Sequence, residues 1–428
     1  MPSIKEIRQN RIKKLENISQ TGLDPYPAKT KRTHTCQEAL ERFEEISSTK
    51  EEIFLTGRLM TVREHGGSTF CHLQDGAGRI QAYFKKDQLG EKEYKFFLDN
   101  FDMGDFIEVG GTLFLTKKGE KTLLVDKYRM LAKSLLPLPE KWHGLKDAEE
   151  RFRKRYLDLI MNSEVKEIFA QRSAIVQKIR EFLQTNGFME VETPVLQLLY
   201  GGASAKPFKT HLNALDIDLY LRIAPELYLK RLLIGGLERV FEIGRCFRNE
   251  GMDREHNPDF TMLECYAAYW DWEKLMEFME KLMHYLAPEI FPEKWDRVEY
   301  QDIVTNGDEK GSFVQIKKPT FVLRLPNIPL AKNKEALQGV VQGMELIKAF
   351  SEQNNPIAQR TAFEKQEKLR QKGDEEAQRL DNDFLEALEY GMPPAAGFGL
   401  GIDRLIVVLT KAKSLRESIL FPLMKPKE

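Results

Sequence analysis

The chain has 428 residues, of which 42% are hydrophobic and 31% are charged, and its formal net charge is −1. This length predicts two or three domains, and the composition excludes a disordered or low-complexity chain. The near-neutral balance excludes a general attraction to polyanions, so any contact with nucleic acid must come from local basic clusters. No apolar stretch approaches the length of about 18 residues that spans a bilayer, and no apolar export signal is present, so we expect a cytoplasmic protein with no membrane contact.

Cysteines stand at positions 36, 71, 246 and 265, far apart in the sequence. This spacing supports neither a disulfide framework nor a thiolate zinc site. We expect four reduced, buried thiols.

The first 33 residues are rich in positive charge. A helix with Ile4, Ile7, Leu15 and Ile18 turned inward would present a cationic face to RNA phosphates, although a solvated helix face fits the same pattern. The basic residues of this segment are Lys5, Arg8, Arg11, Lys13, Lys14, Lys29, Lys31 and Arg32.

Short strands with Gly or charged turns between them are predicted after this N-terminal helical extension, which we assign to residues 1–50. The strands cover 53–62, 68–75, 79–84, 105–114 and 121–126, with a helix at 91–100. Five strands with one inserted helix predict a small Greek-key barrel of the oligonucleotide-binding kind over residues 51–134. The sheet face of such a barrel stacks unpaired bases.

The run Leu-Leu-Pro-Leu-Pro at 135–139 interrupts regular structure and indicates a linker over residues 135–150. From 151 to 428, long helices alternate with strands, and no strand-helix-strand unit repeats. This order predicts an α+β domain with an antiparallel sheet.

Apolar residues recur at helical spacing between Val165 and Thr185, and Gly187 follows as a C-cap signal. We therefore expect a long amphipathic helix here. A strand over 188–193 is predicted next and ends at Pro194.

A hairpin is predicted around Arg248 and Glu250, which stand where one strand ends before a polar loop. The guanidinium fork of an Arg binds phosphate oxygens, and an aromatic ring offers a face on which a base stacks. An isolated Arg-x-Glu is more often a solvated surface hairpin. The two-residue alternation of the returning strand places four side chains on one face: Phe260, Met262, Glu264 and Tyr266.

Glycines alternate at Gly397, Gly399 and Gly401, shortly before Arg404 and the apolar run 405–409. Such glycines allow a ligand to approach the backbone, although a lone Gly-x-Gly-x-Gly is more often a turn or packing device.

In this order, the long helix with its strand and Pro, the Phe-Arg-x-Glu hairpin and the Gly-rich segment resemble motifs 1, 2 and 3 of the class II aminoacyl-tRNA synthetases. Five further segments make the chain similar to the lysyl type: 201–203, 220–230, 242–243, 350–352 and 418–422. The resemblance covers the whole chain. It implies an N-terminal five-stranded OB-fold β-barrel and a class II catalytic domain with an antiparallel sheet and flanking helices.

The resemblance implies ATP-dependent activation of L-lysine to lysyl-adenylate and transfer to the 3′ end of tRNA(Lys). Arg248 would bridge the α-phosphate and the lysine carboxylate, and Arg404 would bind near the γ-phosphate. Glu250, His256 and Phe260 would complete the ATP contacts, with adenine stacked on Phe260. The same resemblance makes Glu345 the ligand of Mg²⁺.

The lysine and anticodon contacts are also carried over from the family. The implied lysine-binding residues are Gly202, Glu226, Glu264, Tyr266 and Glu352. The implied anticodon contacts are Arg63, Phe70, Gln81 and Glu120. Two plainer interpretations stay open: Phe70 as a core aromatic residue, and Glu264 in an ion pair with a protein Arg.

Two residues depart from the family pattern. Lys348 stands where the family has Asn, and Gln338 stands where it has a second metal-binding Glu. Either the match to the family motif is out of register here, next to the poorly patterned segment 291–318 that has lost a family insertion, or the amino-acid and metal sites differ from the family pattern. Because an ammonium in the pocket would repel lysine, we expect Lys348 to turn away or to pair with Glu352.

The first motif is the usual dimer seam of this class, so a homodimer is expected. Two alternatives remain: a paralogue that passes lysine or a related amino acid to another acceptor, and a non-catalytic RNA-binding protein on the same scaffold. The complete barrel disfavours the first, and the retained Arg and Phe residues disfavour the second.

Overall fold

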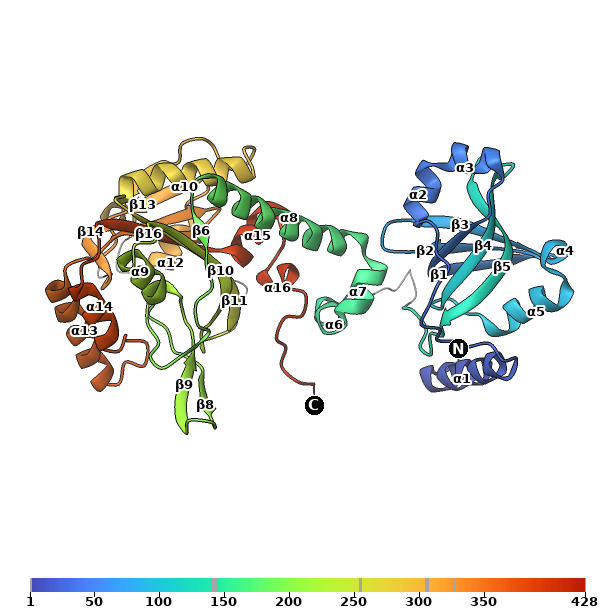
Figure 1. Ribbon diagram of the computed structural model, residues 1–428, viewed down its shortest axis with the longest axis horizontal. Helices are drawn as coiled ribbons and strands as arrows, with labels where there is room; N and C mark the ends of the chain where they lie inside the picture. The colour runs from blue at the N-terminus through green and yellow to red at the C-terminus, as the bar shows by residue number, and fades with distance from the viewer. Residues whose placement is uncertain are drawn as a thin grey trace. The chain divides into compact units, whose positions relative to one another are not determined.

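The computed structural model describes residues 2–139, 145, 147–253, 256–304, 308–326 and 328–427. It divides into two compact units, Met1–Gly144 and Leu145–Glu428, which are described separately (Figure 1). The predicted linker falls partly on 140–144 and 146, outside the described residues. Within the described ranges, none of the helices combines the length and apolarity needed to cross a membrane.

A closed five-stranded barrel forms the body of the first unit, with strand order β1-β2-β3-β5-β4. Its strands are β1 Ile53–His65, β2 Ser68–Gln74, β3 Arg79–Lys85, β4 Phe106–Leu115 and β5 Lys121–Ala132. Helices α4 (Lys86–Leu89) and α5 (Glu91–Asn100) connect β3 to β4. The predicted strands and helix are confirmed, and β1 and β5 extend beyond their predicted ends. Alternate residues of β1 point into the apolar core, as strand geometry requires.

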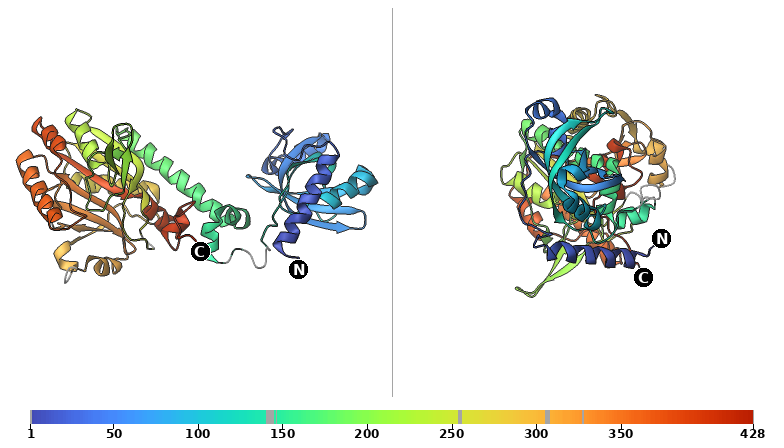
Figure 2. Two further views of the ribbon diagram at one scale, coloured as in Figure 1. Left: turned by 90° about the horizontal axis from the view of Figure 1, so that it is seen from below. Right: turned by 90° about the vertical axis from the view of Figure 1, so that its right-hand side faces the viewer.

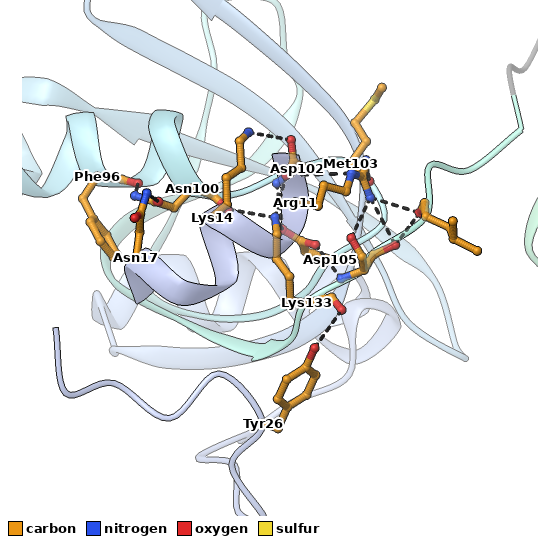
Figure 3. A network of polar contacts seen from close by, with 12 residues as sticks. Arg11, Lys14, Asn17, Tyr26, Phe96, Asn100, Asp102, Met103, Asp105 and Lys133 are labelled. Atoms are coloured by element: carbon orange, nitrogen blue, oxygen red, sulfur yellow. Dashed lines mark hydrogen bonds and ion pairs between the residues drawn. The ribbon is translucent and has the colours of Figure 1, made fainter. Parts of the chain in front are cut away.

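Three helices precede the barrel: α1 Ile4–Gln20, α2 Cys36–Glu41 and α3 Phe43–Thr49. The expected inward face of α1 is partly wrong, because Ile4 is 65% exposed whereas Ile18 is buried. Arg11 is buried as well. Its guanidinium donates hydrogen bonds to the carbonyls of Met103, Ser134 and Leu136 at 2.8–3.0 Å (Figure 3).

Beside Arg11 lies a cluster of buried charges, which holds α1 against the barrel. Lys133 donates to Asp102 at 2.6 Å and to Asp105 at 2.8 Å, and Lys14 donates to Asp102 at 2.8 Å (Figure 3). Arg11 and Lys14 are therefore engaged within the protein and not on a free cationic face. Lys5, Arg8 and Lys13 are the exposed basic residues of α1.

An eight-stranded sheet forms the centre of the second unit, with order β12-β13-β14-β15-β16-β11-β10-β6. All neighbours are antiparallel except the pairs β12/β13 and β6/β10. The strands are β6 Met189–Glu190, β10 Arg239–Phe247, β11 Asp259–Ala268, β12 Asp296–Glu299, β13 Thr320–Leu323, β14 Ala331–Val341, β15 Met344–Glu352 and β16 Ala395–Gly401. A smaller sheet has the order β7-β9-β8, formed by β7 Leu196–Gln197, β8 Lys209–Leu212 and β9 Ile217–Leu221. The predicted α+β class is confirmed.

One face of the large sheet is covered by α8 (Ser163–Thr185), α10 (Trp272–Leu286) and α15 (Ile402–Thr410), which share its largest apolar core (Figure 1, Figure 2). The predicted long helix is confirmed, two residues longer at its start. Gly187 has φ +82° and follows the helix end as expected. The strand predicted at 188–193 is too long, because only two residues pair with β10.

The opposite face carries α9 (Glu226–Ile234), α13 (Pro356–Gln371) and α14 (Asn382–Glu389), which share a second core with β13, β14 and β15. The remaining short helices are α6 Ala148–Arg153, α7 Arg155–Met161, α11 Tyr300–Ile303, α12 Glu309–Val314 and α16 Leu415–Ser418. The poorly patterned segment 291–318 contains β12, α11 and α12, and its residues 305–307 lie outside the described part. All four cysteines are free and buried, as predicted.

Candidate active site

A cavity of about 500 Å³ opens on the sheet face that α8, α10 and α15 leave uncovered. The strand alternation expected for β11 is confirmed, because Phe260, Met262, Glu264 and Tyr266 all line this cavity. The structure also brings residues from distant parts of the chain to its wall: Gly202, Glu226, Arg248, Glu250, His256, Glu345, Lys348, Gly397, Gly399 and Arg404.

Two of the alternating glycines differ in what they permit. A Cβ at Gly397 would lie 2.3 Å from the Tyr266 ring, so this glycine is required for packing. A Cβ at Gly399 would meet only side-chain atoms of Met262 and Glu264, at 3.4–3.8 Å. The predicted open approach to the backbone therefore holds at Gly399 and not at Gly397.

One end of the cavity gathers the groups expected to bind ATP. The Arg248 guanidinium lies 5.0 Å from the centre of the Phe260 ring. Its Nε is buried and has no hydrogen-bond partner within the described part of the chain. A guanidinium in the wall of a cavity is suited to an anionic ligand.

Arg404 is oriented by two contacts at the same end. Its Nη1 donates to the Glu345 carbonyl at 2.9 Å, and its Nη2 lies 3.2 Å from His256 Nε2. His256 Nδ1 lies 2.9 Å from an Asp253 carboxylate oxygen. Since an Arg only donates, Nε2 accepts and the proton of a neutral His256 stands on Nδ1. Glu250 is exposed at the rim.

The other end of the cavity is acidic and deeply buried. Glu226, Glu264 and Glu352 are each at most 4% exposed. Burial raises the pKa of all three carboxyls, and that of Glu264 rises to about 8 with a further contribution from repulsion by Glu226. Tyr266 donates its hydroxyl to Glu264 at 2.6 Å.

Lys230 supplies the only basic group that forms an ion pair with these carboxyls among the described residues. Its Nζ donates to Glu226 at 2.6 Å and also contacts Glu352. Three carboxylates against one ammonium leave two negative charges uncompensated when all groups are ionised. The interpretation of Glu264 as the partner of a protein Arg fails, because its hydrogen-bond partner is Tyr266.

Sequence reasoning missed Lys230, although its place four residues after Glu226 on a helix was a usable signal. Of the two expectations for Lys348, the pairing with Glu352 is wrong, because Glu352 pairs with Lys230. Lys348 is exposed and lines the cavity. Gln338 is directly opposite Lys348 in the β14/β15 ladder, so the two departures from the family pattern are neighbours.

A second candidate surface lies on the barrel of the first unit. Phe70 is half-buried and stacks on Tyr83 with ring centres 4.4 Å apart, and Arg63 is its exposed cross-strand neighbour. The interpretation of Phe70 as a core residue is therefore wrong. Gln81 donates to Glu120 at 2.8 Å on the same barrel. Sequence reasoning missed Tyr83, because the pairing of β2 with β3 decides this contact.

Both units match known family models. Residues 147–425 match the tRNA synthetases of class II (D, K and N), and residues 53–131 match the OB-fold nucleic acid binding domain. The first match covers well over half of the chain, so the protein belongs to the class II tRNA synthetases of the D, K and N group.

Full-length relatives narrow the group further. The chain is 42% identical to the lysine-tRNA ligase of Fervidobacterium nodosum, over 99% of this chain and 95% of the relative. It is 44% identical to that of Moorella thermoacetica, over 98% and 97%, and 43% identical to that of Roseiflexus castenholzii, over 99% and 100%. The first alignment spans 484 positions against 428 residues here, so that relative contains residues without a counterpart in this chain.

Proposed function

We propose that the protein is a lysine-tRNA ligase that activates L-lysine with ATP and transfers it to the 3′ end of tRNA(Lys). Within the D, K and N group of synthetases, one observation favours lysine as the substrate: at the buried end of the cavity, three carboxyls share a single paired ammonium. Lysine brings two ammonium groups, which would stabilise the ionised forms of these buried carboxyls. A substrate with an acidic or amide side chain would leave these buried charges uncompensated.

The first step is a displacement at phosphorus. A carboxylate oxygen of lysine attacks the α-phosphorus of ATP, the bond to the β-phosphate oxygen breaks, and pyrophosphate leaves. In the second step a terminal ribose hydroxyl of tRNA attacks the acyl carbon, AMP leaves, and the hydroxyl proton is lost. Alignment and charge neutralisation are what the protein must supply.

Arg248 and Arg404 perform the neutralisation in this proposal. Arg248 bridges the α-phosphate and the carboxylate, and Arg404 holds the distal phosphates; both guanidinium groups line the cavity, which supports these roles. Phe260 shares its ring between Arg248 on one side and adenine on the other, with Glu250 and His256 at the nucleotide edge. Gly202, Glu226, Glu264, Tyr266 and Glu352 surround the lysine.

Glu345 is the proposed ligand of Mg²⁺. In the described residues there is no group of three acidic, His or Cys side chains that would hold a metal. Glu345 and the buried, unpartnered Oε1 of Gln338 are hard oxygen donors on the cavity wall. They fit a cation that takes its other ligands from ATP phosphates and water and that neutralises phosphate charge when bound.

We place anticodon recognition on the barrel, with bases stacking on Phe70 and with Arg63, Gln81 and Glu120 at base edges. We also propose a cytoplasmic homodimer that associates through α8 and the segment after it. The segment after α8 exposes four apolar side chains: Met189, Val195, Leu196 and Leu198. An obligate interface should bury about 2,000 Å² or more, and a monomer in sedimentation at micromolar concentration would contradict it.

Exchange of labelled pyrophosphate into ATP, measured with each of the twenty amino acids, tests the function. We expect exchange with lysine above all others, and charging of tRNA(Lys) at a comparable lysine concentration. Exchange without charging would favour the paralogue with another acceptor, and no exchange with any amino acid would favour the non-catalytic RNA-binding protein.

A further inference from the structure

Lys348 is a charged residue on a central strand of the sheet, and the roles proposed above for the cavity residues do not include it. β15 lies between β14 and β16, and the Lys348 side chain is exposed to the cavity. Among the residues that the structure describes, no carboxylate forms an ion pair with it. A lysine on an inner strand that lines the cavity and forms no ion pair with the described carboxylates is available to a ligand.

The strand register defines the surroundings of this ammonium. One row across the sheet contains Gln338, Lys348, Gly399 and Glu264, each hydrogen-bonded to the next strand. Gln338 is neutral and Gly399 has no side chain. The backbones of Lys348 and Glu264 are therefore separated by two strand spacings, about 10 Å, over an open floor.

In this row, Lys348 therefore lies on one side of Gly399 and the carboxyl of Glu264 on the other. The rest of the cavity is divided in the same way: Glu226 and Glu352 lie at the acidic end, and Arg248 and Arg404 lie at the end expected to bind phosphate. Lys348 also acts on Glu226, opposing the rise in the pKa of that carboxyl. An α-amino acid over Gly399 would direct its ammonium groups to the glutamates and its carboxylate to Lys348.

We propose that Lys348 binds the carboxylate of the substrate amino acid, as a second cation beside Arg248. This inference rests on the proposed function. It also resolves the repulsion expected between Lys348 and a lysine substrate, because the ammonium faces the one anionic group that lysine has. The carboxylate oxygen that attacks phosphorus is thereby held between two positive charges.

The test compares L-lysine with L-lysinamide, which keeps both ammonium groups and lacks the carboxylate. The dissociation constant of lysine and the inhibition constant of lysinamide are measured for the wild type and for Lys348→Met, Lys348→Arg and Lys365→Met. Lys365→Met is the matched control, because Lys365 is an exposed lysine of α13 outside the cavity.

Lys348→Met should weaken lysine about 10- to 150-fold, the range of a hydrogen bond to a charged group. Lysinamide should change by less than about twofold, Lys348→Arg should recover part of the loss, and Lys365→Met should match the wild type. Equal weakening of both ligands would indicate a structural role, and equal strengthening would indicate simple repulsion, so either result overturns the inference. The wild-type exchange assay separates the two proposals, since absent exchange with lysine refutes the function itself.

Discussion

Each of the two units buries a cluster of charges, and the clusters differ in how they are balanced. In the barrel, Lys133, Arg11 and Lys14 surround Asp102 and Asp105, so cations outnumber carboxylates. In the catalytic unit, Lys230 pairs with Glu226 and Glu352, and no ion pair to Glu264 is present among the described residues. The first cluster is satisfied by the protein, and we propose that the lysine substrate completes the second.

The pKa directions express this contrast in part. Burial would raise the pKa of Asp102, but hydrogen bonds from Lys133 and Lys14 lower it below its ordinary value, whereas the pKa of the fully buried Asp105 stays raised. Burial raises the pKa of both Glu264 and Glu352, because it outweighs the hydrogen bond from Tyr266 and the contact with Lys230. A buried charge cluster thus stabilises a fold when its partners are internal and marks a binding site when they are missing.

The largest effect is expected from Arg248→Ala. This substitution removes the positive charge that faces the reacting phosphate, so pyrophosphate exchange should fall about a thousandfold, the upper range for the loss of one such donor. Arg245→Ala is the control, because Arg245 is an exposed residue of β10, three residues before Arg248, and it pairs with Asp259. A loss below tenfold for Arg248→Ala would contradict its role.

Lys133→Met tests whether the barrel cluster is purely structural. Removal of this fully buried ammonium leaves two carboxylates without it, which should cost about 3–5 kcal/mol of unfolding free energy. The control Lys127→Met breaks an exposed pair with Glu52 and a distant contact with the Phe54 ring, and should cost about 1 kcal/mol. Urea unfolding followed by circular dichroism measures both. Equal costs would show that the barrel cluster contributes no more than a surface pair.

Phe70→Ala separates the barrel from the chemistry. Base stacking is worth about 1–3 kcal/mol, so tRNA charging should fall about 5- to 150-fold while pyrophosphate exchange stays within about twofold. Phe106→Ala removes another partly exposed aromatic residue of the barrel and should change neither activity. Equal losses in charging and exchange for Phe70→Ala would refute the assignment.

The smallest effect is a pH dependence of lysine binding. Because the folded-state pKa of Glu264 is raised to about 8 from 4.5, its contribution to stability is complete below pH 4.5 and disappears as the pH rises through 8. The lysine ammonium favours the ionised carboxyl, so the rise in melting temperature caused by lysine should grow from pH 6 to pH 8. Glu264→Gln should weaken lysine binding and reduce this slope, leaving the part that comes from Glu226 and Glu352, and a slope unchanged by Glu264→Gln would contradict the assignment.

The sequence by itself determined the elements and much of the wall of the site. The alternation of Phe260, Met262, Glu264 and Tyr266 follows from the two-residue period of a strand, and the long helix from Val165 follows from helical spacing. These patterns are local, so they survive in any fold that buries one face of the element.

Only the tertiary structure decided which charges meet. Lys230 pairs with Glu352 because α9 packs against the sheet, and this contact displaces the pairing expected between Lys348 and Glu352. Arg11, which reads as part of a cationic surface, is buried because carbonyls from two distant loops converge on it. Long-range contacts of this kind depend on strand register and helix packing. The spacing of residues within a single element does not specify either.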